Sequence, residues 1–233
     1  MPKIGGPAQR GILIVIVIIL AIAMIVAYTY DKIRLSGIKV ESQFVNSVGM
    51  EMIKLTTGYW VSKFEVTQNQ YKEIMGEDPS VFKGGTNPVE NVSFQEAIQF
   101  CTKLTEKDKE KGVLPTGFVY NLPSFEQWIE FYADAPIENS VTPRGKKKQF
   151  LDHHMPVGSG EVNRLGIYDL RGNVREYSSD INPTYGTPYV LGAFYNEISE
   201  EFLRMENKCH ITEKGDYKDE IIGFRCVLMK AER

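Results

Sequence analysis

The sequence predicts an α+β protein with a few short helices, short strands and long irregular loops. Three stretches carry the capping box that opens a helix, and two earlier stretches are rich in aromatic and β-branched residues. Regular signals fade after Ala135, where Gly, Pro, Asn and Asp become frequent. Long loops inside a compact domain need an additional link that holds them together. We therefore expect a bound metal ion or a disulfide in this part of the domain.

An apolar stretch precedes this domain. Every residue from 11 to 27 is apolar, and with the next three the stretch reaches about 20 residues, the length of a transmembrane helix. A cleaved signal peptide is the alternative, but the run is longer than a usual signal segment and no clean cleavage site follows. We therefore expect a tail over 1–10, a transmembrane helix over 11–30, a connector over 31–43 and one domain over 44–233.

The flanking charges predict an orientation. Lys3 and Arg10 precede the apolar stretch, while Asp31, Lys32 and Arg34 follow it. Positive charge favours the cytoplasmic side, so the N-terminus is expected in the cytoplasm. The protein is thus predicted to be a single-pass membrane protein whose main domain lies on the periplasmic or extracytoplasmic side.

The charge balance excludes one class of partner. The chain has 27 basic and 30 acidic residues, and removing Lys3 and Arg10 leaves 25 against 30, a net charge of −5 for residues 31–233. A mildly acidic domain is a poor candidate for binding nucleic acid. Membrane and protein partners are expected instead.

The elements follow in order along the domain. "MEMIKL" (50–55) and "YWVSKFEV" (59–66) are predicted strands separated by Thr-Thr-Gly. Three helices are then predicted by Ser or Thr paired with Gln or Glu three residues later, which satisfies free amides of the first turn. These pairs are Thr67 with Gln70, Ser93 with Glu96, and Ser124 with Gln127. The first helix is expected to end at Gly76, and later apolar runs such as "YVLGAFY" and "IIGFRCVLM" lie between loops.

Several blocks of the sequence resemble one known family. "FVNSVGMEM", "VSKFEVTQNQY", "PSVFKGGTNPVENVSFQEAIQFCTKL", "YNLPSFEQWIEFYA", "PVGSGEVNRLGIYDLRGNVREYSSD" and "GFRCV" occur in the order of the formylglycine-generating enzyme, or sulfatase-modifying factor, family. The resemblance covers about residues 44–229. It implies a loop-rich, C-type-lectin-like domain, in agreement with the α+β prediction.

The resemblance also implies an active site, which this chain does not keep. Active members are copper-dependent oxidases that convert a sulfatase cysteine to formylglycine, with a Gly-Gly-Ser and two copper-binding cysteines near the C-terminus. Here Gly192, Ala193 and Phe194 stand over Gly-Gly-Ser, and Glu197 and Phe202 stand where the cysteines are expected. Copper(I) prefers soft thiolates, so the site is predicted to be degenerate, without copper.

The resemblance also implies a structural calcium ion at the stretch "GNVREY". In the family, the corresponding asparagine, nearby main-chain carbonyls and glutamate surround calcium, and Asn173, Val174 and Glu176 keep those oxygen donors. The alternative is that Asn173 only makes a turn and Glu176 pairs with an arginine. A calcium ion is predicted as a structural cofactor.

The cysteines and histidines complete the candidate residues. The resemblance implies a disulfide between Cys101 and Cys226, with Cys209 left as a thiol; two buried free thiols are the alternative. His153, His154 and His210 lack the spacing of a metal site and are expected in loops.

Together these residues predict a non-catalytic, membrane-anchored scaffold or interaction subunit of a cell-envelope complex. One alternative is an enzyme, either a formylglycine-generating oxidase or a relative of the iron-dependent sulfoxide synthases, although the cysteine pair and a His-rich iron motif are missing. Another alternative is a lectin-like module that binds a glycan or peptide. Its candidate aromatic residues are Tyr185, Tyr189, Phe194 and Tyr195.

Overall fold

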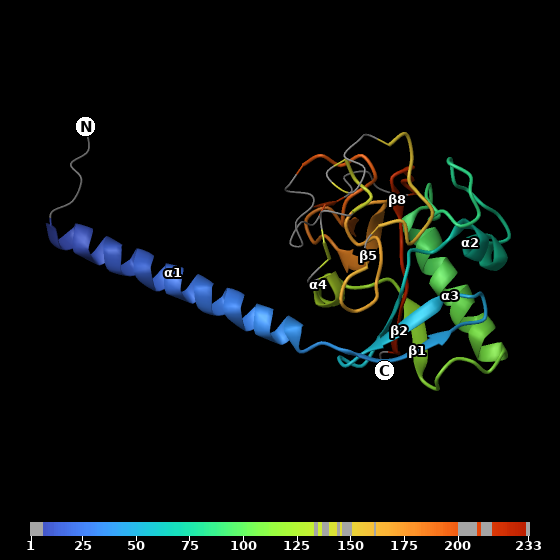
Figure 1. The fold of residues 1–233 in the computed structure, drawn as a ribbon, viewed down its shortest axis with the longest axis horizontal. Coiled ribbons are helices and arrows are strands. Elements are labelled where there is room, and N and C mark those ends of the chain that lie inside the picture. Colours follow the sequence, from blue (N-terminus) through green and yellow to red (C-terminus); the bar gives the residue numbers. More distant parts are fainter. Residues whose placement is uncertain are drawn as a thin grey trace. The chain divides into compact units, whose positions relative to one another are not determined.

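The chain forms two units in the computed structural model (Figure 1). One unit spans Met1–Ile38 and the other spans Lys39–Arg233. The structure describes residues 7–132, 135–136, 140–143, 145, 151–160, 162–199, 209–210 and 216–231. The candidate site lies in the second unit.

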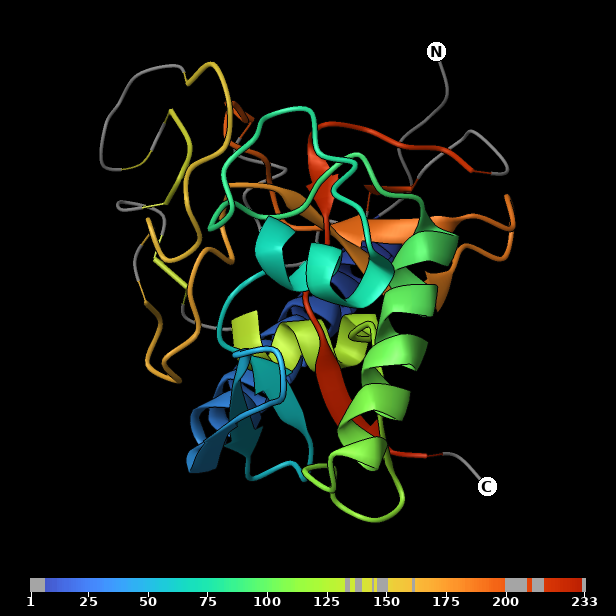
Figure 2. The same cartoon turned by 90° about the vertical axis from the view of Figure 1, so that its right-hand side faces the viewer.

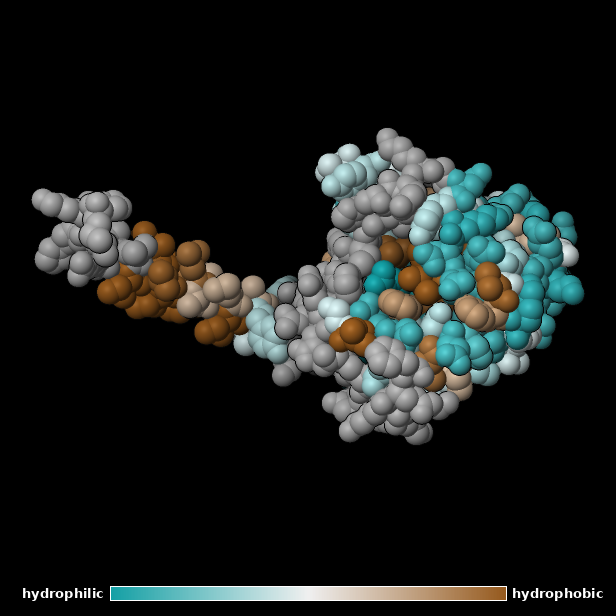
Figure 3. Space-filling view, turned by 90° about the horizontal axis from the view of Figure 1, so that it is seen from above, coloured by the Kyte–Doolittle hydropathy of each residue, from teal (hydrophilic) through white to brown (hydrophobic). Residues whose placement is uncertain are grey.

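The first unit contains helix α1 (Pro7–Ser36), which includes the stretch predicted to span a membrane. Its described apolar side chains are exposed, and Figure 3 shows them as a brown stretch. Within the described residues, however, none of the helices combines the length and the apolarity that crossing a bilayer requires. The predicted transmembrane helix is therefore not supported.

An antiparallel sheet opens and closes the second unit. Its order in the described residues is β1 (Val40–Val45), β2 (Glu51–Leu55), β3 (Trp60–Ser62), β9 (Val227–Lys230) and β4 (Phe118–Asn121). The last strand, β9, pairs with β3 on one side and with β4 on the other. The predicted strand over 59–66 is therefore shorter than expected: beyond Ser62 the chain leaves this sheet, and the Val66 N–H donates to the Phe224 carbonyl.

Three helices lie between these strands, as the capping boxes predict. They are α2 (Gln68–Met75), α3 (Phe94–Glu110) and α4 (Phe125–Tyr132). The Ser93 hydroxyl accepts a hydrogen bond from the Glu96 N–H, and the Ser93 N–H donates to the Glu96 carboxylate. The boxes at Thr67 and Ser124 are likewise reciprocal. Gly76 ends α2 with φ 89°, a conformation that favours glycine.

A second sheet forms within the stretch predicted to be mostly loops. Its order is β7 (Cys209–His210), β6 (Pro188–Leu191), β5 (Arg175–Ile181) and β8 (Ile222–Gly223). Strand β5 runs antiparallel to β6 and parallel to β8. Long connections separate these short strands, so a mixed helix and sheet domain with extensive loops is confirmed.

The apolar core joins the helices to the C-terminal segment. The Tyr71 ring of α2 stacks on Phe100 of α3 at 5.7 Å between centroids, and Phe100 meets Phe224 edge-on at 5.3 Å. On α3, Ala97, Cys101 and Leu104 are buried. Figure 2 shows α3 beside the C-terminal segment that carries β8 and β9. The residues around "GFRCV" therefore lie at the centre of the domain.

Candidate functional site

A tight turn places the residues of "GNVREY". Gly172 has φ +128°, and a Cβ atom built there would lie 2.4 Å from the Val141 carbonyl oxygen, so this position requires glycine. Asn173 follows with φ 63°, the left-handed conformation that asparagine tolerates. The chain then enters β5, which directs the Glu176 side chain into the interior.

Glu176 and Arg225 form a buried ion pair with two hydrogen bonds. Arg225 Nε donates to Glu176 Oε2 at 2.6 Å, and Nη2 donates to Oε1 at 2.7 Å. Both side chains are inaccessible to solvent, at 1% and 0% exposure. Arg225 also donates to the Tyr168 carbonyl at 3.0 Å and to the Ser62 carbonyl at 3.4 Å. One guanidinium thus ties β3, β5 and the loop before the turn.

Two further carboxyl groups lie close to this pair. Asn173 Nδ2 donates to Glu65 Oε1 at 3.1 Å, and Asn173 Oδ1 accepts from the Met155 N–H at 2.8 Å. Asp169 accepts hydrogen bonds from the Gly158 and Gly160 N–H groups. Glu65 is 1% exposed and its Oε2 has no hydrogen-bond donor within the described residues. We call Glu65, Asp169, Glu176 and Arg225 the buried charge cluster.

Burial makes full ionisation of this cluster unfavourable. It raises the pKa of Glu65 well above its usual value, and the nearby Asp169 charge raises it further. Burial also raises the pKa values of Asp169 and Glu176, although Arg225 acts in the opposite direction. Three carboxyl groups face one guanidinium, so a bound proton or an additional cation would stabilise the cluster.

These contacts bear on the predicted calcium ion in two opposite ways. Carboxylate and carbonyl oxygens suit calcium, and the charge imbalance favours a cation. However, both Glu176 oxygens accept from Arg225, which is the alternative considered from the sequence. Among the described residues, no group of three or more His, Cys, Asp or Glu side chains is placed to hold a metal. Calcium at Asn173, Val174 and Glu176 stays a prediction.

An ion pair lies in the stretch that the family resemblance aligns with the active site. Arg175 Nη2 donates to Glu197 Oε2 at 2.8 Å, and the Arg175 guanidinium lies 5.1 Å from the centre of the Phe194 ring. The other Glu197 oxygen accepts from the Ser199 N–H at 2.9 Å. Gly192 and Ala193 come just before Phe194, and Ala193 is fully buried. Phe202 lies outside the described residues.

Cys101 and Cys226 lie next to each other but are not bonded. Their sulfur atoms are 3.8 Å apart, whereas a disulfide requires about 2.05 Å. Burial raises the pKa of Cys226 well above its usual value, and hydrogen bonding to Cys101 adds to this effect. Both remain free thiols in the core, so the predicted disulfide is not supported. The Cys209 side chain lies outside the described part of the chain.

The structure also places the predicted loop histidine and the candidate sugar-stacking aromatic residues. His154 is expected in a loop, and it lies in one, but its side chain is fully buried with Nε2 3.5 Å from Glu90 Oε1. Tyr195, a candidate for stacking on a sugar, is 6% exposed and packs edge-on against Phe82. Tyr185 is 45% exposed, so the predicted aromatic set divides between core and surface.

Sequence reasoning missed Glu65, Asp169 and Arg225 as members of one cluster. Each stands between apolar neighbours, in "FEV", "YDL" and "FRC". A charged residue inside an apolar run indicates a buried, paired group. That signal was present, but their separation along the chain hid the partners.

These features define a class of protein: a loop-rich α+β domain whose C-terminal Gly-Phe-Arg segment is inserted into the core. The family described as "Sulfatase-modifying factor enzyme 1-like domain" matches residues 35–230. The chain belongs to this family.

Individual relatives are more distant. The chain is 25% identical over 170 residues to the "Chaperone protein LppX" of Paenibacillus barcinonensis, a match that covers 51% of this chain and 61% of that protein. Among solved structures, it is similar to PvdO from Pseudomonas aeruginosa (18% identity, TM-score 0.63, covering 83% of this chain and 99% of that one). It is also similar to "Treponema denticola variable protein 1" (18%, 0.61, 83% and 93%) and to CarF (19%, 0.59, 84% and 97%). At these identities the structures show a shared fold.

Proposed function

We propose that this chain is a non-catalytic member of its family that acts by binding other proteins, as an interaction or accessory subunit. The observation that carries the proposal is the ion pair between Arg175 and Glu197. It puts a neutralised carboxylate where an active member has a copper-binding thiolate, and a carboxylate is a poor ligand for copper(I). The relative named as a chaperone protein supports a protein-binding role.

A place in the cell envelope, beside other membrane-complex proteins, belongs to the same proposal. Its support is the exposed apolar side chains of α1, which require a cover of lipid or protein. A membrane-spanning anchor is not part of it. Nucleic acid is not proposed as a partner, because the domain carries a net negative charge.

Copper binding tests the absence of catalysis. The wild-type chain should not bind copper(I) tightly in a competition titration with a chromogenic chelator, nor convert a sulfatase-derived cysteine peptide, as followed by mass. The double variant Glu197→Cys/Phe202→Cys should gain copper(I) binding, because it supplies two thiolates. The single variant Glu197→Cys is the matched control and should gain much less.

Two results would contradict the proposal. One is a mass loss in the peptide that corresponds to conversion of the thiol to an aldehyde by the wild-type chain. The other is a protein that is recovered alone and monomeric when purified through the full chain in several mild detergents. The first result would refute the absence of catalysis, and the second would refute the role as a subunit.

A further inference from the structure

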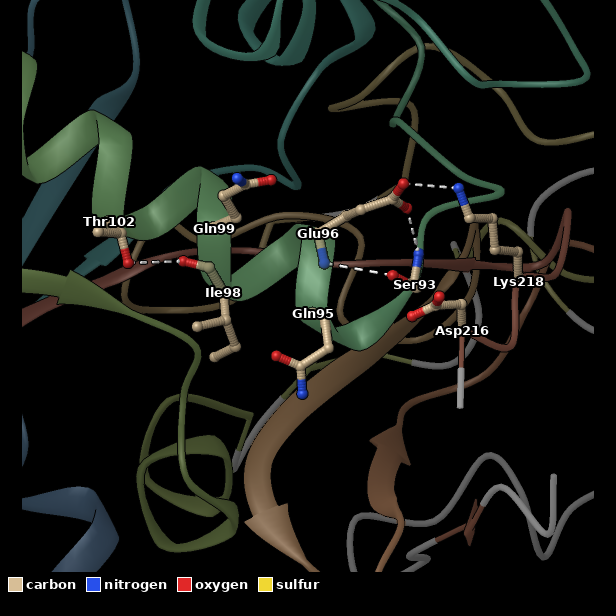
Figure 4. A pocket seen from close by; sticks show the side chains of 8 residues that line it. All are labelled: Ser93, Gln95, Glu96, Ile98, Gln99, Thr102, Asp216 and Lys218. Carbon is tan, nitrogen blue, oxygen red and sulfur yellow. Dashed lines mark hydrogen bonds and ion pairs between the residues drawn. The ribbon is translucent and has the colours of Figure 1, made fainter. Parts of the chain in front are cut away.

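A polar groove lies along the start of α3, on the domain surface (Figure 4). Its volume is about 550 Å³. The exposed side of α3 forms one wall, and residues 216–218, which precede β8, form the other. The lining residues are Ser93, Gln95, Glu96, Ile98, Gln99, Thr102, Asp216 and Lys218.

Part of this lining is held in place by contacts within the chain. Lys218 Nζ lies 2.6 Å from Glu96 Oε1, and the other Glu96 oxygen accepts from the Ser93 N–H. The ion pair joins the two walls and lowers the pKa of Glu96, through the hydrogen bonds that oppose its burial. The Glu96 and Lys218 charges in the groove therefore neutralise each other.

In the part of the chain that the structure describes, three polar side chains of the groove have no protein partner. Within the described residues, the amides of Gln95 and Gln99 and the carboxylate of Asp216 make no hydrogen bond or ion pair. In Figure 4, Ile98 and Gln95 project from the same side of α3, and Asp216 lies across from them. The groove thus presents an apolar group, an amide that both donates and accepts, and an unpaired negative charge.

We infer that the groove binds an extended peptide segment that carries a lysine or arginine close to an aliphatic residue. The Gln95 amide pairs with a peptide group, Asp216 attracts the cation, and Ile98 contacts the aliphatic side chain. In an extended chain, residues two apart share one face and lie about 7 Å apart, so both side chains can face the groove. The lining contains no aromatic ring to stack on a sugar, which favours a peptide over a glycan.

This inference rests on the proposed protein-binding function and names the kind of segment bound. The probe is a fluorescent peptide with two repeats of Val-Thr-Lys-Thr, blocked at both ends, titrated with the full chain by anisotropy. A peptide with glutamate in place of lysine is the comparison. The lysine peptide should bind at least fivefold more tightly, and added salt should reduce the difference.

Variants locate the binding. Asp216→Asn should weaken the lysine peptide about three- to fivefold, as for an exposed ion pair, and Gln95→Ala should weaken both peptides by a similar factor. The controls Glu106→Gln, elsewhere on α3, and Gln43→Ala, on β1, should leave both affinities unchanged. Equal binding of the two peptides, equal affinity of the variants and wild type, or no binding of either peptide would overturn the inference. The subunit role would still stand if partners co-purify, and it would fail separately if they do not.

Discussion

The helices and the loop-rich half of this domain are held by different kinds of contact. Helices α2, α3 and α4 begin at capping residues whose partners are three positions away, as in the pair Ser93 and Glu96. In the loop-rich half, Asn173 contacts Glu65 across 108 positions, and Glu176 contacts Arg225 across 49. Local contacts therefore set the helices, whereas distant, buried polar contacts set the loops.

The two kinds of contact also differ in what their loss costs. A helix cap is worth about 1 kcal/mol, because water replaces part of the lost hydrogen bond. Breaking a buried ion pair costs about 3–5 kcal/mol, because a charge is left without compensation in the interior. The loop-rich half should therefore be the more sensitive to a single substitution.

Removing Arg225 should give the largest effect. Arg225→Met leaves three buried carboxyl groups without their guanidinium, so the free energy of unfolding should fall by about 3–5 kcal/mol. Urea denaturation followed by tryptophan fluorescence measures this change.

The double variant Glu176→Met/Arg225→Met is the control for this prediction. It removes both partners and should recover a substantial part of the loss. If Arg225→Met lowered the free energy of unfolding by less than about 1 kcal/mol, the buried charge cluster would not be the main stabilising contact of the loop-rich half.

The pH dependence should distinguish a bound proton from a bound calcium ion. The folded-state pKa values of Glu65, Asp169 and Glu176 are raised, so the folded state binds protons more strongly than the unfolded state. In calcium-free buffer, the stability that these three groups contribute should be fully present below their unfolded-state pKa values and should be lost as the pH rises through the folded-state pKa values, by up to about 1.4 kcal/mol per pH unit for each proton.

Calcium should oppose this decline if it binds, because a cation stabilises the ionised carboxylates. Adding calcium at neutral pH should then raise the melting temperature, a chelator should lower it, and Glu176→Ala should abolish this sensitivity. Indifference of the wild-type protein to both additions would leave the proton as the balancing charge.

The same contrast explains what the sequence predicts well. The capping boxes and the helix end at Gly76 depend on neighbours within one or two turns, so the sequence pattern predicted them. Strand β3 ends at Ser62, earlier than predicted, because Val66 pairs instead with Phe224, far along the chain. Arg225 escaped notice for the same reason, since its partners come from three separate segments.

The sequence predicted which residues belong to the candidate site better than it predicted their contacts. The substitution at Glu197 was visible from the resemblance, but its ion pair with Arg175 depends on how the loop after β6 folds back. Asn173 and Glu176 were recognised as oxygen donors, yet their actual partners are Glu65 and Arg225. The type of each residue can be read directly from the sequence, whereas its partner depends on how distant segments fold together.

Removing single caps should give a smaller effect in the helical half. Ser93→Ala and Ser124→Ala should each reduce the free energy of unfolding by about 1 kcal/mol, through loss of the hydroxyl that accepts the first-turn amide. Ser42→Ala, on the exposed strand β1, is the matched control and should change stability by less than about 0.5 kcal/mol. A loss as large as that of Arg225→Met would remove the distinction between the two halves.

The smallest expected effect concerns Cys101 and Cys226, which join the two halves. Cys101 belongs to α3 and Cys226 follows Arg225, so a bond between them would add a long-range covalent tie. Their sulfur atoms lie 3.8 Å apart, in contact but unbonded. Dithiothreitol should therefore leave the melting temperature unchanged, and both thiols should react with maleimide after denaturation without reductant. Cys101→Ala provides the control, since it should lose one label while the Cys226 label remains. A fall in the melting temperature on reduction, with both labels absent before it, would show that the two cysteines are bonded.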